Sequence, residues 1–245
     1  QTTTTLLLLL LLPALAAAAP LPTPASPACN KTYAAHLFAQ KTLVPAWPLQ
    51  PTDPYDAQTP ASLQHIHDVL ANKTIVCALK YTADDRSTYE LKDFDSKQLA
   101  EEAGYVVTHQ GVCGACSSTQ DLSVYLLRPD LTSPVRSCGL RGIFSHAATV
   151  SCLQRLDFSA PCADVWAYNI HQTRRHCFGI CMKALILGWP NNLPDGSLNA
   201  CLQCDEDVSG PVFKFYAGRT RRNSGIQSAI KRPPSQQYNM THCYY

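Results

Sequence analysis

The spacing of apolar and polar residues predicts a short β region at the start of the folded part of the chain. Residues 59–71 carry apolar side chains at helical spacing after a Thr-Pro pair that favours a helix start. Residues 74–81 and 87–94 alternate around a polar turn, which is typical of a β-hairpin. A short helix over 97–103 and a strand over 105–108 are expected to follow.

After residue 110 the pattern changes to that of helices. We predict helices over 117–127, 144–156 and 161–187, and another helix or turn over 198–206. One face of the longest helix has an unusual composition, since six residues recur there at steps of three or four: Cys162, Trp166, Asn169, Thr173, Cys177 and Cys181. This face is predicted to be buried and held by disulfides, with Asn169 hydrogen-bonded internally. The alternative is that the same face lines a ligand site. The expected fold class is α+β, with a small N-terminal hairpin and strand region before a mostly helical, disulfide-stapled C-terminal part.

Three segments differ in composition. Residues 1–19 contain an apolar run followed by small residues, which is typical of a signal peptide and short of the ~20 residues that span a membrane. Residues 20–58 form a proline-rich arm, because repeated prolines exclude a long helix or a central strand. Residues 59–245 are predicted to be a single disulfide-rich α+β domain.

The cysteine content indicates an oxidising compartment. The 245 residues include an even number of cysteines, all of which can pair: Cys29, Cys77, Cys113, Cys116, Cys138, Cys152, Cys162, Cys177, Cys181, Cys201, Cys204 and Cys243. Asn30, Asn72 and Asn239 begin Asn-X-Thr glycosylation sequons. Together these features predict a secreted, cysteine-rich extracellular glycoprotein with disulfide bonds and no transmembrane span after signal cleavage.

The charged residues point to an anionic ligand. The net charge is only +2, which with the expected compartment argues against nucleic acid as a partner. The basic residues nevertheless concentrate near the C-terminus, where no carboxylate side chain follows Asp207. Arg219, Arg221 and Arg222 offer forked donors beside Asn223 and Ser224. This segment predicts a site for a glycan, a phosphate or a lipid head group.

The stretch from His109 to Leu127 is the main candidate for chemistry. It reads as a strand end, a glycine turn with two cysteines, and a helix start. A cysteine at a helix N-terminus favours the thiolate, and Cys113-Gly-Ala-Cys116 has the layout of a thioredoxin-type redox motif. The even cysteine count favours the other interpretation, in which both residues are structural half-cystines.

The same stretch, Gln110-Gly-Val-Cys-Gly-Ala-Cys116-Ser117, resembles the nucleophile region of papain-like cysteine proteases. The resemblance implies Cys116 as nucleophile, Gln110 as oxyanion donor and Cys113 as a disulfide partner. His109 or His242 would then serve as the base. The chain departs from the family pattern at Ser117, where those proteases have Trp, and too few residues follow Cys116 for their second lobe.

Three functions therefore stay open. The leading hypothesis is a secreted binding or structural module with a basic anion-binding C-terminal segment. The alternatives are an extracellular cysteine-nucleophile hydrolase and a thiol–disulfide oxidoreductase. We expect no cofactor and no metal, because His65 and His67 cannot share a helical face and Cys177 with Cys181 fits disulfides better in an exported chain. Nothing in the chain predicts an oligomeric state.

Overall fold

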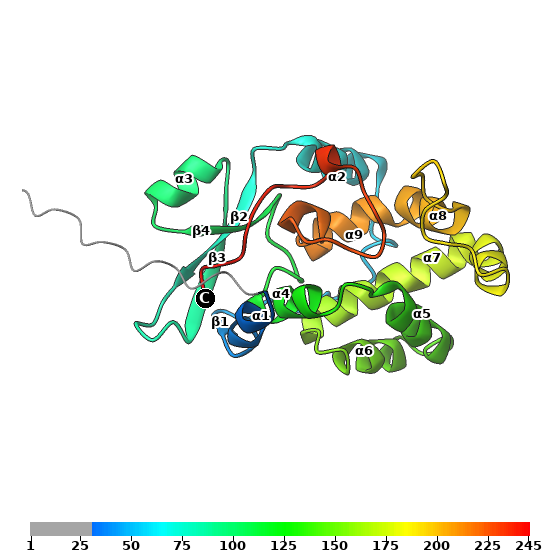
Figure 1. Ribbon diagram of the computed structural model, residues 1–245, viewed down its shortest axis with the longest axis horizontal. Coiled ribbons are helices and arrows are strands. Elements are labelled where there is room, and N and C mark those ends of the chain that lie inside the picture. The colour runs from blue at the N-terminus through cyan, green and yellow to red at the C-terminus, as the bar shows by residue number, and fades with distance from the viewer. Residues whose placement is uncertain (1–30) are drawn as a thin grey trace, which may run out of the picture.

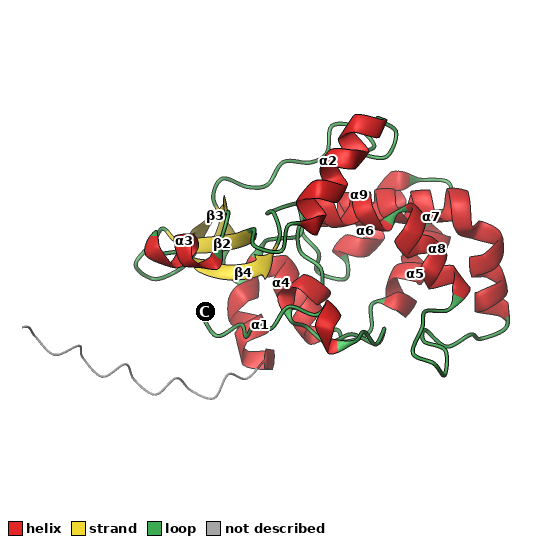
Figure 2. Cartoon of the chain, turned by 90° about the horizontal axis from the view of Figure 1, so that it is seen from above, coloured by secondary structure: helices red, strands yellow, loops and turns green. Residues whose placement is uncertain are grey.

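The computed structural model describes residues 31–245 and confirms the α+β class, with a small sheet at one end and helices at the other (Figures 1 and 2). The strands of the mixed sheet lie in the order β1-β3-β2-β4. Their bounds are Thr42–Leu43 for β1, Val76–Tyr81 for β2, Thr88–Phe94 for β3 and Val106–Gln110 for β4. The predicted hairpin is the antiparallel pair β2–β3, and β4 pairs antiparallel with the other edge of β2.

Helix α3 (Lys97–Glu102) covers this sheet, and Ser96 caps its first turn as expected. Its Ala100 is buried in a small core with Val76, Ala78 and Val107. This core belongs to the sheet and is separate from the larger core of the helical part.

The other helices build the larger part of the molecule. They are α1 (Lys31–Ala39), α2 (Pro60–Ala71), α4 (Thr119–Leu127), α5 (Thr132–Arg141), α6 (His146–Gln154), α7 (Ala160–Ile186), α8 (Ala200–Val208) and α9 (Gly210–Ala217). The sequence predicted α2, α4, α6, α7 and α8 within a few residues. It did not predict α1, α5 or α9. Helix α5 has little apolar content, and α9 starts at Gly210-Pro211, a pair that otherwise signals a turn.

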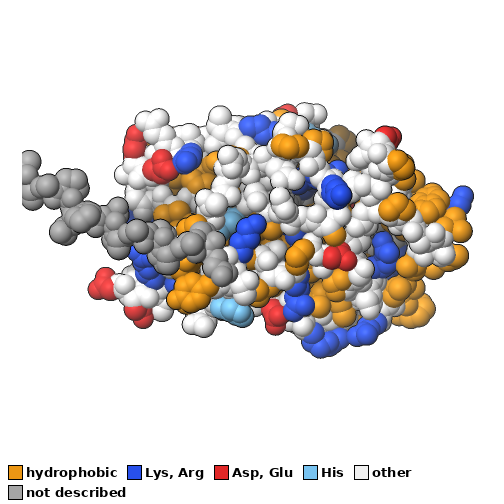
Figure 3. Space-filling view, in the orientation of Figure 1, with side chains coloured by type: hydrophobic (Ala, Val, Ile, Leu, Met, Phe, Trp, Pro, Cys, Tyr) orange, Lys and Arg blue, Asp and Glu red, His pale blue; other side chains and the backbone are white. Residues whose placement is uncertain are grey.

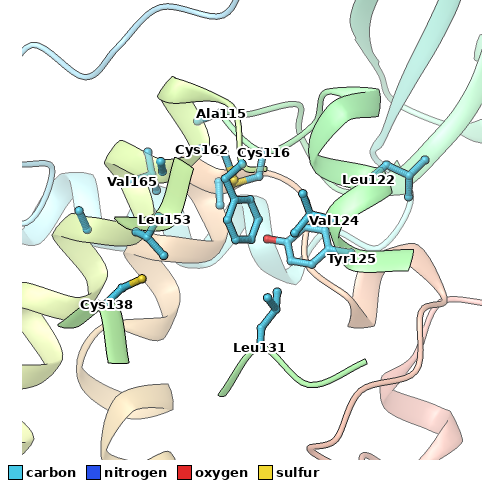
Figure 4. Close-up of a cluster of buried hydrophobic side chains, with 14 of the residues drawn as sticks. Ala115, Cys116, Leu122, Val124, Tyr125, Leu131, Cys138, Leu153, Cys162 and Val165 are labelled. Atoms are coloured by element: carbon cyan, nitrogen blue, oxygen red, sulfur yellow. A yellow bond between two sulfur atoms is a disulfide. The ribbon is translucent and has the colours of Figure 1, made fainter. Parts of the chain in front are cut away.

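A disulfide lies in the middle of the helical core. Cys116 and Cys162 join α7 to the segment before α4, beside the ring of Tyr125 and the side chain of Leu153 (Figure 4). The residues of this core come mainly from α1, α4, α6 and α7, with Cys138 of α5 and Ala217 of α9, so elements distant in sequence share one apolar interior. Phe38 of α1 is fully buried there, which ties part of the proline-rich arm to the domain.

Five disulfides connect the described elements: Cys77–Cys113, Cys116–Cys162, Cys138–Cys152, Cys177–Cys204 and Cys181–Cys201. No cysteine within residues 31–245 is free. Such cross-linking fits a disulfide-rich extracellular module. None of the described helices combines the length and apolar content needed to cross a membrane. The predicted signal peptide, Cys29 and the sequon at Asn30 lie outside the described residues.

Candidate functional site

The turn between β4 and α4, residues 111–118, is locked against the end of α9; we call it the central turn. The amides of Ala115 and Cys116 donate to the carbonyls of Tyr216 and Ala217 over 2.9 and 2.8 Å. The two backbones are so close that a Cβ on Gly114 would lie 2.5 Å from the amide nitrogen of Gly218. Glycine is therefore required at position 114, and the turn has no room to move.

The two cysteines of the central turn have different, distant partners. Cys113 bonds to Cys77 on β2, and Cys116 bonds to Cys162 on α7. A redox pair would require the two to bond each other reversibly, and a nucleophile would require a free thiolate at Cys116. The structure corrects both catalytic expectations, because these sulfurs are cross-links. The structural interpretation of the pair fits this arrangement.

His109 and Gln110, the other expected catalytic residues, also make structural hydrogen bonds. His109 is fully buried, and its Nδ1–H donates to the carbonyl of Gln110 over 2.9 Å. Its Nε2 therefore accepts from the Ser117 hydroxyl at 2.7 Å. Burial and the nearby charge of Arg219 hold the pKa of His109 well below its usual value, so the ring is neutral. The Gln110 amide donates to the Lys73 carbonyl over 2.7 Å and is not aimed at Cys116.

His242, the second expected base, is also buried and lies within the electrostatic influence of Arg219. Its Nε2–H donates to the carbonyl of Ser224 over 2.8 Å, and its Nδ1 accepts from the Tyr244 hydroxyl at 2.9 Å. Burial, assisted by the charge of Arg219, lowers the pKa of His242 to about 4. Like His109, it is a neutral hydrogen-bonding ring without access to Cys116.

Arg219 is the centre of this polar interior. Its side chain is fully buried, and no carboxylate of residues 31–245 pairs with it. Instead it donates to neutral oxygens: the carbonyls of Thr108, Cys116 and Ser117 and the hydroxyls of Thr108 and Ser224. We call Thr108, His109, Ser117, Arg219, Ser224, His242 and Tyr244 the interior network. A cation held this way connects β4, the central turn and the C-terminal segment, and it is closed to an external anion.

Asp121 is the nearest buried carboxyl group to this network. It accepts from the Ser159 amide at 2.8 Å and the Ser159 hydroxyl at 2.7 Å, and the Ser118 hydroxyl also points at it. Burial raises the pKa of Asp121 to about 6, although these hydrogen bonds and Arg219 oppose the rise. It joins the starts of α4 and α7.

The predicted anion-binding segment is divided by the fold. Arg219 and Ser224 point inward to the network. The side-chain amide of Asn223 donates to the carbonyls of Gln110 and Gly218. Arg222 donates to both oxygens of Glu206, at 2.8 and 2.9 Å. Arg221 lies over the ring of Tyr125 at 5.2 Å from its centroid. Of the five predicted residues, only Arg221 and Arg222 place a charged side chain at a cavity. The five residues therefore cannot bind one anion together.

Arg221 reaches a cavity of about 260 Å³ between α5, α7, α8 and the C-terminal segment, which we call the apolar groove. Its walls are mainly aliphatic and aromatic, and include Val135, Leu140, Ile170, Phe178, Met182 and Leu185. Phe178, Met182 and Leu185 share one face of α7. An elongated apolar molecule would be desolvated along this face.

Positively charged side chains outnumber negatively charged ones in the lining of the apolar groove. Its lining includes three arginines, Arg136, Arg174 and Arg221, and a single carboxylate, Asp205. Asp205 accepts from the Ser209 hydroxyl at 2.7 Å and from Thr173 and Asn169, which confirms the internal partners expected for Asn169. Neither Arg136 nor Arg174 makes an ion pair with another described residue. The groove is therefore positive.

Arg221 is the most buried of the three cations. Burial lowers its pKa, while Tyr125 and Asp130 oppose the change. Its Nη2 donates to the Arg128 carbonyl, but the buried Nε has no hydrogen-bond partner among the described residues. A buried donor without an acceptor is costly, and an anion in the groove would reduce that cost.

A second, polar cavity of about 590 Å³ lies between α2, the central turn and the C-terminal segment. Lys73, Lys214 and Arg222 line it, and none of its described lining residues is acidic. Lys214, Arg222 and Arg232 all converge on Glu206, at 2.7–2.9 Å. Burial alone would raise the pKa of Glu206, but these three cations hold it below its usual value. One carboxylate balances three cations, which leaves positive charge beside the cavity.

One family model matches the chain. It describes a family of unknown function, DUF8771, and covers residues 146–240, from α6 to the segment beyond Arg222. Searches of curated proteins and of solved structures returned no significant match. The matched region contains α7, α8 and most of the apolar groove, but neither α5 nor the central turn.

Sequence reasoning missed the groove residues on α5 and the outward face of α7. The signal was present, because Arg174, Phe178, Met182 and Leu185 recur at helical spacing. The cysteine stripe of the same helix drew the interpretation toward burial, although its Trp166, Asn169, Thr173 and Cys181 also line the groove. Arg136 could not have been placed without α5, which the pattern did not predict.

Proposed function

We propose that this protein is an extracellular binding module that holds an amphiphilic anion, such as a fatty carboxylate, in the apolar groove. The observation that carries the proposal is the combination of apolar walls with three arginines against one carboxylate. The apolar body of the ligand would pack along Ile170, Phe178 and Met182. Its anionic head would accept hydrogen bonds from Arg136, Arg174 or the unsatisfied Nε of Arg221.

The proposal is tested by titrating the protein with monomeric dodecanoate in a calorimeter. Each CH₂ that the groove buries contributes about 0.8 kcal/mol, so shortening the chain by one carbon weakens binding about fourfold. Dodecyl trimethylammonium, with the same chain and the opposite charge, binds at least tenfold more weakly. Equal affinity for the two amphiphiles would show that the arginines do not recognise the head group.

Substitutions test whether the groove arginines bind the anionic head group. Arg174→Gln or Arg136→Gln lowers dodecanoate affinity about threefold to tenfold, the size of an exposed charge-assisted contact. Arg155→Gln is the matched control, because Arg155 is an exposed arginine that caps the C-terminal end of the neighbouring α6 and does not line the groove. Loss of binding in the control, or none in the groove variants, would contradict the assignment.

A second candidate is a polyanion, for example a sulfated glycan, at the polar cavity. It is favoured by the surplus of cations around Glu206 and by the absence of acidic residues among the described lining. If it is correct, Lys73→Gln reduces retention on heparin and Arg174→Gln does not. The catalytic alternatives are not proposed, because both need a free thiolate at Cys113 or Cys116.

Secretion and glycosylation belong to the same proposal. Asn72 and Asn239 are exposed, so both sequons offer an accessible side-chain amide. Enzymatic removal of N-glycans from protein secreted by its natural host is expected to lower its mass, and Asn72→Gln with Asn239→Gln to remove part of that shift. An unchanged mass would contradict glycosylation without affecting the groove.

A further inference from the structure

A patch of exposed apolar side chains surrounds the mouth of the apolar groove. Phe144 is 98% exposed, Ile186 75%, Leu187 58%, Phe178 51% and Leu140 48%. Soluble monomers rarely leave so many large apolar side chains in one region without a partner for them. We call these five residues the apolar rim.

Four of the rim residues adjoin the groove, and Leu187 follows Ile186 at the end of α7. Leu140 and Phe178 line the groove itself, and Ile186 lies on the same face of α7 as Phe178, two turns further along. Phe144 lines a neighbouring cavity that shares Ile170 and Arg174 with the groove. Figure 3 shows apolar side chains gathered over the end of the molecule where α5, α7 and α8 lie, with Lys and Arg side chains beside them.

The charge around the rim is positive. Residues 131–189 contain six basic and two acidic side chains: Arg136, Arg141, Arg155, Arg174, Arg175 and Lys183 against Asp157 and Asp164. Both carboxylates already have partners, since Asp157 pairs with Arg128 at 3.0 Å and Asp164 with His146 at 2.7 Å. Two carboxylates from outside this segment also lie nearby, because Asp56 pairs with Arg175 at 3.4 Å and Asp53 lines the cavity next to Phe144. The other five cations make no ion pair with a described residue. A surface with this net charge attracts anions over a Debye length.

Large apolar side chains that project between arginines and lysines are the combination that inserts into the interface of an anionic membrane. We propose that the module docks on anionic membrane surfaces through the apolar rim, which places the mouth of the groove against the lipids. This inference rests on the proposed function, because docking there would present the groove with amphiphiles. A second copy of the chain is a poorer occupant, since two such positive surfaces would repel each other.

Sedimentation with vesicles tests the docking. The unmodified protein should partition at least tenfold more strongly onto vesicles of phosphatidylglycerol and phosphatidylcholine than onto phosphatidylcholine alone, and salt should weaken the binding. Phe178→Ser combined with Ile186→Ser should lower partitioning at least tenfold. Leu99→Ser combined with Val106→Ser is the control, because these residues are 47% and 41% exposed at the sheet end of the molecule. Neutralising Arg136 or Arg174 should cost about fivefold each.

The outcomes separate this inference from the function on which it rests. If dodecanoate binds in solution but anionic vesicles do not sediment the protein, docking is overturned and the groove assignment stands. If neither binds, both fall. Equal binding to neutral vesicles, or a dimer in solution that Phe178→Ser dissociates, would also overturn docking, the latter because the rim would then be an interface between copies.

Discussion

Arg219 and Arg221 are two residues apart, yet their guanidinium groups lie in opposite surroundings. Arg219 occupies the interior network, where every neighbouring oxygen is already placed to accept from it. Arg221 lies at the apolar groove with a buried Nε that no described residue satisfies. The first region is rich in residues associated with catalysis and is closed. The second has few such residues and is open, and we assign binding to it.

The difference shows how residue type can mislead. Cysteine, histidine, serine and arginine gather at the central turn in an order that resembles an active site. There each polar group stabilises the fold, because it is buried and hydrogen-bonded. A buried hydrogen-bond donor without a partner, beside apolar walls, is a better indication of a ligand site than the presence of residue types common in active sites.

The sharpest contrast in stability is expected between two glycines. Gly114→Ala places a Cβ within 2.6 Å of the Ala217 and Gly218 backbone, which cannot yield, so we expect a loss of at least about 4 kcal/mol. Gly179→Ala on α7 meets nothing within 4 Å and should stabilise the helix by up to about 1 kcal/mol. Thermal unfolding measures both. A stable Gly114→Ala variant would show that the central turn is not locked.

Arg219→Met is expected to cost about 4 kcal/mol, since it leaves several buried oxygens without a donor. Arg174→Met should change stability by less than about 0.5 kcal/mol, because Arg174 makes no ion pair with a described residue. Denaturant unfolding compares them. Similar costs would remove the distinction between the closed and the open region.

Removing the disulfide in the helical core with Cys116→Ala and Cys162→Ala should cost about 4 kcal/mol, because it closes a loop with a sequence separation of 46 residues. Dodecanoate affinity at a temperature where the variant is folded should be unchanged. If this variant instead abolished a hydrolytic or redox activity while staying folded, the catalytic interpretation of Cys116 would have to be restored.

The pH dependence of stability should follow the buried histidines. The pKa of His242 is about 4 in the folded protein against 6.5 when unfolded, so its contribution is complete above pH 6.5 and is lost as the pH falls toward 4. The loss is on the order of 2–3 kcal/mol, and His109 acts in the same direction.

The titration of Asp121 has the opposite effect on the pH dependence of stability. Its folded pKa of about 6 is above the unfolded value, so its contribution is present at low pH and is lost as the pH rises through 6. His242→Gln should therefore flatten or reverse the rise in unfolding temperature between pH 4 and 6.5. An unchanged slope would show that His242 does not titrate on unfolding.

Much of the fold could be predicted because local signals were strong. The Thr59-Pro60 start of α2, the hairpin and the Ser96 cap all depend on neighbours in sequence. The cysteine stripe of α7 correctly indicated a face stapled by disulfides. Burial holds for only half of it, because Trp166, Thr173 and Cys181 are half-buried and line the apolar groove. The pairing of Cys113 with Cys77 and of Cys116 with Cys162 could not be predicted, since spacing carries no information on connectivity.

The candidate site was less predictable for the same reason. Whether Arg219 or Arg221 faces a cavity depends on how η1 (Arg222–Ser224) and the residues before it pack against β4 and the central turn. Those contacts span about a hundred residues of sequence. The run of cations predicted an anion site, while the apolar walls that select an amphiphile come from α5, α7 and α8 and appear only in three dimensions.

Photolabelling tests the central claim most directly. The unmodified protein is irradiated with a fatty acid that carries a diazirine in its chain, and the labelled peptides are identified by mass spectrometry. We predict labels on α5 and α7, at residues such as Leu140, Phe178 and Met182, which excess dodecanoate removes. Labels concentrated on the central turn, or spread evenly and insensitive to dodecanoate, would contradict the assignment of binding to the apolar groove.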